Sequence, residues 1–126
     1  MTRFLLAGGG TAGHVNPMLA LADEIRRDNP NHEILTLGTA EGLEARLVPA
    51  RGYRLETVPK LPFPRKFGLY LFKFPVQFRA AVATTKRLIR EHQIEIVIGF
   101  GGYASAPAYQ AARELKIPLV IHEANA

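Results

Sequence analysis

The sequence predicts an α/β fold, a Rossmann-like doubly wound parallel sheet with helices on both faces. Short apolar runs alternate along the chain with longer stretches of helical periodicity, and glycine-rich turns follow the first and the fourth of these runs. With 126 residues the chain has the size of one domain. Because 48% of the residues are hydrophobic and 21% are charged, the composition is that of a globular protein and excludes a disordered one.

The first half of the chain is expected to supply three strands and two helices. The apolar run 3–7 predicts a buried strand that ends at three glycines. Asn16 and Pro17 predict a helix start, with Asn16 as the N-cap and Pro17 at the first helical position, and this helix should end near residues 29–30. Further strands are expected over 33–37 and 53–58, with a short helix over 41–50.

The second half repeats the alternation of helix and strand. A loop with two prolines over 61–64 leads to a long helical stretch over 67–91, which should be interrupted or kinked at Pro75. A strand over 95–99, a helix over 105–115 and a strand over 118–122 follow. This alternation favours a parallel sheet of order 3-2-1-4-5, in which ligands bind beyond the carboxyl ends of strands 1 and 4.

Both of those strand ends carry a glycine-rich turn, residues 8–14 and residues 99–107. Glycine lets backbone N–H groups approach an anion, and each turn leads into a helix whose amino terminus carries a partial positive charge. Two such turns facing one crevice suit a diphosphate. The alternative is that the glycines only make sharp turns between strand and helix.

The first turn also resembles two other kinds of nucleotide site. Gly8, Gly10 and Gly13 match G-x-G-x-x-G, so a dinucleotide-binding oxidoreductase domain is one alternative. That fingerprint wants an acidic residue at the end of the second strand, where this chain has Leu37-Gly38-Thr39. A Walker P-loop is excluded, because no Gly-Lys-Ser/Thr follows the glycines.

Polar side chains with catalytic chemistry stand next to these strand ends. His14 follows the first turn, where a helix amino terminus favours the neutral imidazole, which can accept a proton from a sugar hydroxyl. His14 could equally cap the turn or bind a phosphate. After the last strand, Glu123 could orient His14, act as the base itself or cap a helix, and Asn125 can hydrogen-bond a sugar or amide. No metal cluster is visible in the sequence, and the absence of cysteine excludes thiolate sites.

A basic and aromatic segment follows the third predicted strand. Residues 61–90 contain no Asp or Glu and seven basic residues: Arg65, Lys66, Lys73, Arg79, Lys86, Arg87 and Arg90. Large apolar side chains over 61–78 exceed what one buried helix stripe needs, so part of them should lie outward. An apolar patch with a cationic rim favours an anionic membrane surface, with complete burial in the core as the alternative. A nucleic-acid partner fits less well, because the segment is too apolar.

Four motifs together resemble the amino-terminal domain of the MurG family of N-acetylglucosaminyltransferases. They are Gly9-Gly10-Thr11-Ala12-Gly13-His14-Val15-x-Pro17, Leu37-Gly38-Thr39, Gly101-Gly102-Tyr103-Ala104-Ser105-Ala106-Pro107 and His122-Glu123-x-Asn125. The resemblance runs from Phe4 to Asn125. It implies a GT-B fold whose carboxyl-terminal domain binds most of the donor, UDP-N-acetylglucosamine, and that domain is absent from residues 1–126. We therefore expect a truncated piece that is inactive alone.

The resemblance also implies the reaction. An inverting transfer would join N-acetylglucosamine to the muramyl 4-hydroxyl of an undecaprenyl-diphosphate-linked muramyl-pentapeptide, converting lipid I to lipid II in peptidoglycan synthesis, with no cofactor except a magnesium ion that the substrate diphosphate could carry. The protein would act as a peripheral protein at the cytoplasmic face of the bacterial membrane. The alternative from another class is a non-catalytic subunit that recruits a separate transferase chain to the membrane.

The site residues follow from the matched motifs. The resemblance implies His14, or less favourably Glu123, as the catalytic base. Donor contacts would come from Thr11, Ala12, Gly13 and Asn125. The acceptor diphosphate would meet Gly9, Gly10, Gly101, Gly102, Tyr103 and Ser105. The membrane patch would comprise Phe63, Arg65, Lys66, Phe67, Leu69, Leu71, Phe72 and Lys73. The chain departs from the family at Ala12, often glycine, and at Ala124, usually glutamine.

Overall fold

The computed structural model describes residues 1–62, 64 and 67–122. Within these residues the strands are β1 (Arg3–Ala7), β2 (Glu33–Gly38), β3 (Arg54–Thr57), β4 (Ile96–Gly99) and β5 (Leu119–Ile121). The helices are α1 (Ala12–Asp28), α2 (Glu44–Ala50), α3 (Leu69–Glu91) and α4 (Ser105–Glu114). Strands and helices alternate along the chain, so the predicted α/β class is confirmed.

All neighbouring strands in the sheet are parallel, and their order is β3-β2-β1-β4-β5. The central strand β1 pairs with β2 on one side and with β4 on the other. Its last residue, Ala7, lies in register with Leu37 of β2 and Gly99 of β4. The carboxyl ends of these three strands therefore lie side by side, and the predicted order is confirmed.

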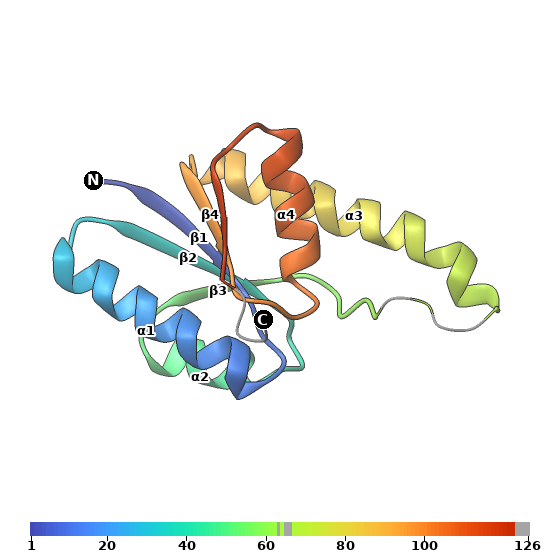
Figure 1. The fold of residues 1–126 in the computed structure, drawn as a ribbon, viewed down its shortest axis with the longest axis horizontal. Coiled ribbons are helices and arrows are strands. Elements are labelled where there is room, and N and C mark those ends of the chain that lie inside the picture. The colour runs from blue at the N-terminus through green and yellow to red at the C-terminus, as the bar shows by residue number, and fades with distance from the viewer. Residues whose placement is uncertain (63, 65–66, 123–126) are drawn as a thin grey trace.

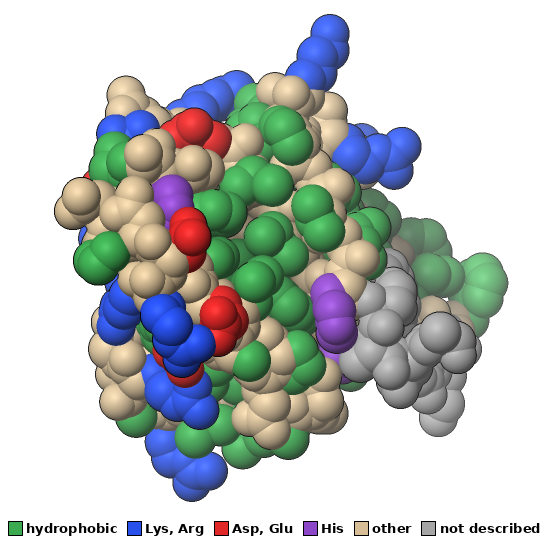
Figure 2. Space-filling view, turned by 60° about the vertical axis from the view of Figure 1, so that its left-hand side comes forward, with side chains coloured by type: hydrophobic (Ala, Val, Ile, Leu, Met, Phe, Trp, Pro, Cys, Tyr) green, Lys and Arg blue, Asp and Glu red, His purple; other side chains and the backbone are tan. Residues whose placement is uncertain are grey.

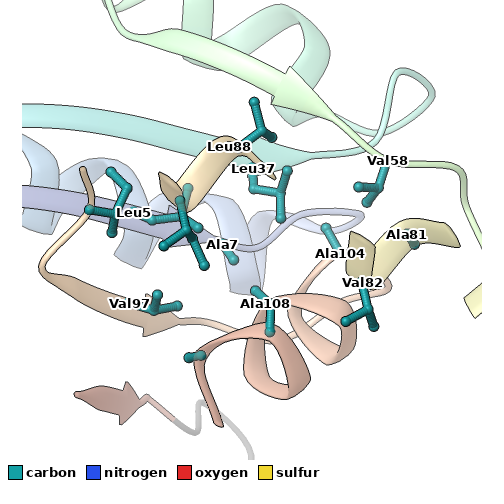
Figure 3. Close-up of a cluster of buried hydrophobic side chains, with 14 of the residues drawn as sticks. Leu5, Ala7, Leu37, Val58, Ala81, Val82, Leu88, Val97, Ala104 and Ala108 are labelled. Atoms are coloured by element: carbon teal, nitrogen blue, oxygen red, sulfur yellow. The ribbon is translucent and has the colours of Figure 1, made fainter. Parts of the chain in front are cut away.

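Helices cover both faces of the sheet (Figure 1). On one face, α3 and α4 contribute residues such as Val82 and Ala108 to a buried cluster with Leu5, Leu37 and Val97 of the strands, as Figure 3 shows. On the other face, the buried residues come mainly from α1, α2 and the alternate positions of the same strands: Leu6, Val15, Met18, Leu19, Ala22, Val48 and Ile98. Successive side chains of a strand point to opposite faces, so each central strand contributes to both clusters.

Helix α1 starts earlier than predicted. Its N-cap is Thr11 rather than Asn16, and Pro17 lies inside the helix. The Thr11 carbonyl oxygen accepts hydrogen bonds from the backbone N–H groups of His14 (3.1 Å) and Val15 (3.0 Å), so the helix begins as soon as the glycines end. The local preference of Asn-Pro for a helix start is overridden, and the missing proline N–H costs one intrahelical bond.

Helix α3 continues through Pro75 from Leu69 to Glu91, so the predicted interruption is wrong, while the predicted alternative of a kink stays a prediction. Its carboxyl-terminal half packs on the sheet, while its first turns project beyond it (Figure 1). A salt bridge from Lys86 to Glu114 ties α3 to α4. The hydrogen bonds that Lys86 and Gln110 donate to Glu114 lower the pKa of its carboxyl group.

Helix α2 begins at Glu44, three residues later than predicted, because residues 40–43 form bends and a turn. The later start places Glu44 in the first turn of α2, where Oε1 accepts a hydrogen bond from the Gly10 N–H of the first glycine-rich loop.

Exposed apolar side chains gather on two elements among the described residues. On edge strand β5, the side chains of Val120 and Ile121 are 48% and 47% exposed. The first turns of α3 carry Leu69, Phe72 and Val76, and Phe67 lies just before them. Figure 2 shows one face of the molecule on which hydrophobic side chains gather at the centre, with charged ones mainly around them. No helix among the described residues is both long and apolar enough to cross a membrane.

Tyr53 joins the α1 side of the fold to the start of β3. Its buried hydroxyl donates a hydrogen bond to Asp23 Oδ1 at 2.5 Å, and the Arg26 guanidinium lies 4.2 Å from the centre of its ring. Burial, followed by the hydrogen bond to Asp23, raises the pKa of Tyr53 to about 12. Ionisation of this phenol is thus harder in the folded chain than in the unfolded chain.

We expect stability to fall as the pH rises from about 10 to about 12, because the unfolded chain then loses the Tyr53 proton before the folded chain does. Urea unfolding at several alkaline pH values measures this fall. Replacing Tyr53 with Phe removes the ionisable group and should flatten this part of the pH dependence. An equally steep fall in Tyr53→Phe would contradict the assignment.

Candidate active site

The first glycine-rich loop connects β1 to α1. The Gly8 N–H donates to the Leu37 carbonyl oxygen at 3.0 Å, which continues the sheet pairing by one residue. Gly10 then has φ +89°, a conformation that L side chains rarely adopt. The chain turns sharply there, and helix α1 begins two residues later at Ala12.

The second glycine-rich loop connects β4 to α4 and packs directly on the first. Gly101 and Gly102 have φ values of +100° and +96°. The Gly9 N–H donates to the Gly101 carbonyl oxygen at 3.3 Å. A Cβ atom at position 102 would lie 2.4 Å from the Gly9 carbonyl oxygen. The two loops therefore meet backbone against backbone, and this approach requires glycine.

Ser105 fixes the second loop from beneath. Its buried hydroxyl accepts a hydrogen bond from the Gly101 N–H at 3.1 Å and lies 3.1 Å from the Ala7 carbonyl oxygen and 3.0 Å from that of Gly101. These bonds face inward, toward the end of β1. The structure thus gives Ser105 a role in holding the loop, while its predicted contact with a ligand diphosphate stays a prediction.

His14 lies in the first turn of α1, against the second loop. Its Nδ1 is 2.9 Å from the Gly9 carbonyl oxygen and 3.4 Å from Thr11 Oγ1. The other edge of the ring lies on Gly101, where an added Cβ atom would be 2.8 Å from Nε2. Because a carbonyl oxygen can only accept, the bond to Gly9 requires the proton on Nδ1. A neutral His14 then keeps the lone pair on Nε2.

Six of the residues predicted for the site line one hollow of about 350 Å³ at the carboxyl end of the sheet. They are Gly9, Gly10, Thr11, His14, Gly102 and Tyr103. Leu61, Phe78 and Ala106 complete the lining and make one side of the hollow apolar. The structure therefore brings both glycine-rich loops and the candidate base to one cavity.

Of the predicted catalytic and ligand-binding residues that the structure describes, Ala12, Gly13, Gly101 and Ser105 do not line this hollow. Ala12 and Gly13 are exposed in the first turn of α1, beside Thr11. Gly101 lies under the His14 ring. Glu123 and Asn125 lie outside the described residues, as do Phe63, Arg65 and Lys66 of the predicted membrane patch.

A second hollow of about 280 Å³ adjoins the first and shares Gly10, Thr11 and Tyr103 with it. Its other lining residues are Thr39, Glu41, Gly42, Glu44 and Lys60. The Lys60 ammonium lies 5.4 Å from the centre of the Tyr103 ring, within the range of a cation–π contact. Lys60 and Glu41 stand in no recognisable sequence motif, so neither was predicted as a site residue.

Glu44 is the main feature of the site that sequence reasoning missed. The side chain is fully buried. Oε1 accepts a hydrogen bond from the Gly10 N–H at 2.9 Å, and Oε2 accepts from the N–H (2.9 Å) and the hydroxyl (3.2 Å) of Thr39. Three glycines surround the carboxylate so closely that a Cβ atom on any of them would collide with it: Gly9, Gly38 and Gly42.

No group of three or more His, Asp or Glu side chains that could hold a metal ion occurs among residues 1–62, 64 and 67–122. The polar side chains at the first hollow are the His14 imidazole and the hydroxyl groups of Thr11 and Tyr103, since the Gly9 and Gly10 N–H groups already donate to the Gly101 carbonyl and to Glu44. These side chains suit a ligand that carries a hydroxyl close to His14.

Comparison with known proteins identifies the family. Residues 4–126 match the glycosyltransferase family 28 N-terminal domain. The chain belongs to this family. A relative from Leifsonia xyli subsp. xyli is 63% identical over all 126 residues, and one from Tropheryma whipplei is 53% identical over the same length. Both are named UDP-N-acetylglucosamine–N-acetylmuramyl-(pentapeptide) pyrophosphoryl-undecaprenol N-acetylglucosamine transferase. The resemblance to MurG stated from the motifs is confirmed.

Solved structures agree with this family 28 assignment. The crystal structure of Acinetobacter baumannii MurG has a TM-score of 0.81 and 28% identity, and the match covers 98% of this chain and 35% of that one. The glycosyltransferase VinC, solved with dTDP, has a TM-score of 0.65 at 16% identity and shows the fold alone. The chain spans 35% of the length of the Leifsonia and Tropheryma relatives.

We expect Gly102→Ala to lower the free energy of unfolding by about 2 kcal/mol or more, because the methyl group would meet the Gly9 carbonyl and φ is positive. Gly68→Ala is the matched control, since a Cβ atom there has nothing within 4 Å. Urea unfolding of both variants measures the difference. Equal stability of the two would show that the loops do not need their close contact.

Proposed function

We propose that the full-length protein transfers N-acetylglucosamine from UDP-N-acetylglucosamine to the muramyl 4-hydroxyl of an undecaprenyl-diphosphate-linked muramyl-pentapeptide. The observation that carries the proposal is the pair of glycine-rich loops packed together beside His14, at the ends of β1 and β4, in a chain of family 28. The names of its relatives support the choice of donor and acceptor. Residues 1–126 would supply the acceptor half of the site.

The proposed chemistry uses groups that face the first hollow. The acceptor 4-hydroxyl oxygen attacks the anomeric carbon of N-acetylglucosamine, the bond from that carbon to the UDP oxygen breaks, and UDP leaves. His14 Nε2 takes the hydroxyl proton, since Nδ1 is occupied with the Gly9 carbonyl. The amino termini of α1 and α4 lie at this edge of the sheet and favour the negative charge of a diphosphate. Glu123 remains the alternative base.

The acceptor carries a lipid, so the protein should work at a membrane, and α3 supports this part of the proposal. Phe67 is 90% exposed, Leu69 77%, and Phe72 and Val76 69% each. Leu69, Phe72 and Val76 are spaced by three and four residues, so they share one side of the helix. Lys73 is exposed on the same side. An apolar strip with a cation beside it suits an anionic bilayer.

The opposite side of the same helix packs inward. Tyr70 contacts Phe74 with 6.0 Å between ring centres, and Phe74 stacks on Phe78 at 5.6 Å. Phe74 and Phe78 pack against the core, and Phe78 also lines the first hollow. Leu71 is only half-buried. The helix therefore connects the exposed strip to the wall of the candidate site, a suitable route for a lipid-linked substrate held at the cytoplasmic face of the membrane.

For the full-length protein we expect transfer of labelled N-acetylglucosamine to a lipid I analogue, and we expect His14→Ala to lower kcat by about 10²- to 10⁴-fold because the base is lost. A steady-state transfer assay at saturating donor and acceptor measures this. His92→Ala is the matched control, since His92 follows the carboxyl end of α3. No transfer by the wild-type protein would refute the function, and unchanged kcat in His14→Ala would refute the base.

For membrane binding we expect Phe72→Ser and Lys73→Gln each to weaken the affinity of the full-length protein for vesicles of phosphatidylcholine and phosphatidylglycerol. Loss of one nearby cation is worth about 1 kcal/mol, or about 5-fold, and loss of the phenyl ring somewhat more. Arg113→Gln removes the same charge from an exposed position on α4 and serves as the control. Vesicle sedimentation measures the binding. Equal binding by all four proteins would contradict the assignment of this surface.

A further inference from the structure

One peptide group links the buried Glu44 to His14. The Gly10 N–H, which donates to Glu44 Oε1 at 2.9 Å, belongs to the same peptide group as the Gly9 carbonyl, which lies 2.9 Å from His14 Nδ1. A trans peptide group is planar, and its N–H and C=O point in opposite directions. Any rotation of this peptide group would therefore weaken both hydrogen bonds together.

The carboxylate is held firmly enough to fix that peptide group. Its second oxygen is bound by the backbone N–H and the hydroxyl of Thr39 at the end of β2. The glycines at 9, 38 and 42 leave the space that the carboxylate occupies, because a Cβ atom at any of them would collide with it. Thr39, at the end of the neighbouring strand β2, thus holds Glu44, and Glu44 in turn holds the orientation of the Gly9–Gly10 peptide group.

Gly10 itself does not favour one orientation. A glycine with φ +89° has no Cβ atom to restrict rotation of the preceding peptide group, so the loop needs an outside partner to hold it. A negative charge at the N–H end also polarises the peptide group and makes its carbonyl oxygen a stronger acceptor. Both effects favour the tautomer of His14 that carries the proton on Nδ1.

We infer that Glu44 is a positioning residue for His14, acting through the Gly9–Gly10 peptide group to keep the proton of the neutral imidazole on Nδ1 and the lone pair on Nε2. This inference rests on the proposed function, in which His14 Nε2 is the base. Glu44 borders the second hollow, but its side chain is fully buried and both oxygens already accept hydrogen bonds from the protein, so we assign it no contact with substrate.

The test uses the full-length protein with ¹⁵N-labelled histidine, without substrates, at about pH 9, where an ordinary imidazole is neutral. The His14 signals are assigned by their absence from His14→Ala, and their ¹⁵N shifts report which nitrogen carries the proton. We expect the wild type to show the Nδ1–H form. In Glu44→Gln, the ratio of the Nδ1–H to the Nε2–H form should fall by about 3- to 10-fold, as the loss of one hydrogen bond gives.

Transfer kinetics supply a second readout. In Glu44→Gln we expect kcat to fall by a similar factor of about 3 to 10, with the KM for UDP-N-acetylglucosamine changed by less than about 2-fold, because only the base is disturbed. Should Glu44→Gln fail to fold, Thr39→Val removes one of the donors that hold the carboxylate and should shift the tautomer ratio in the same direction by less.

Thr85→Val is the matched control, since its buried hydroxyl donates to the Ala81 carbonyl oxygen at 2.8 Å within α3, away from the loops. It should leave the tautomer ratio and kcat unchanged. An unaltered His14 tautomer in both Glu44→Gln and Thr39→Val, or an equal shift in Thr85→Val, would overturn the inference. If the wild type transfers no sugar, the proposed function fails, while the tautomer measurement still decides whether Glu44 orients His14.

Discussion

The pairing of β1 with β2 on one side and β4 on the other determines where the site forms. Because Ala7 lies in register with both Leu37 and Gly99, the loops that follow β1, β2 and β4 leave the sheet at the same level. The loops after β1 and β4 lead into α1 and α4, which cover opposite faces of the sheet. A crevice forms between these two loops where they diverge, and the amino termini of the two helices lie beside it. The contacts between Gly9, Gly101 and Gly102 are a consequence of that convergence.

Much of this arrangement could be predicted from the sequence. The alternation of short apolar runs and helical stretches has a clear period, and the glycine-rich turns follow the correct strands, so the fold, the strand order and the meeting of the two loops were all accessible. The helix boundaries were harder to predict from the sequence. Asn16-Pro17 is a favourable local start, but the Thr11 carbonyl oxygen already has two backbone donors at hand once the glycine turn has formed. Pro75 similarly remains inside α3.

Glu44 could not have been found in the same way. In the sequence it stands in a short helical segment, where a glutamate is usually a solvated surface residue. Its burial depends on the approach of two connections that are separated along the chain, the one after β1 that contains Gly9 and the one after β2 that contains Gly38 and Gly42. The same holds for Lys60, whose place over the Tyr103 ring arises only when β3 and β4 lie in one sheet.

The packing around Glu44 has a consequence for how such a sequence can change. A methyl group at any one of the three glycines would displace the carboxylate, whereas a smaller residue at position 44 would leave the Gly10 and Thr39 N–H groups without their acceptor. Single substitutions at these four positions are therefore each unfavourable. A larger residue at one glycine position combined with a smaller residue at position 44 would conserve the total volume and need not be unfavourable. The four residues form one unit whose effects are not additive, so the loop can diverge only through coordinated replacement.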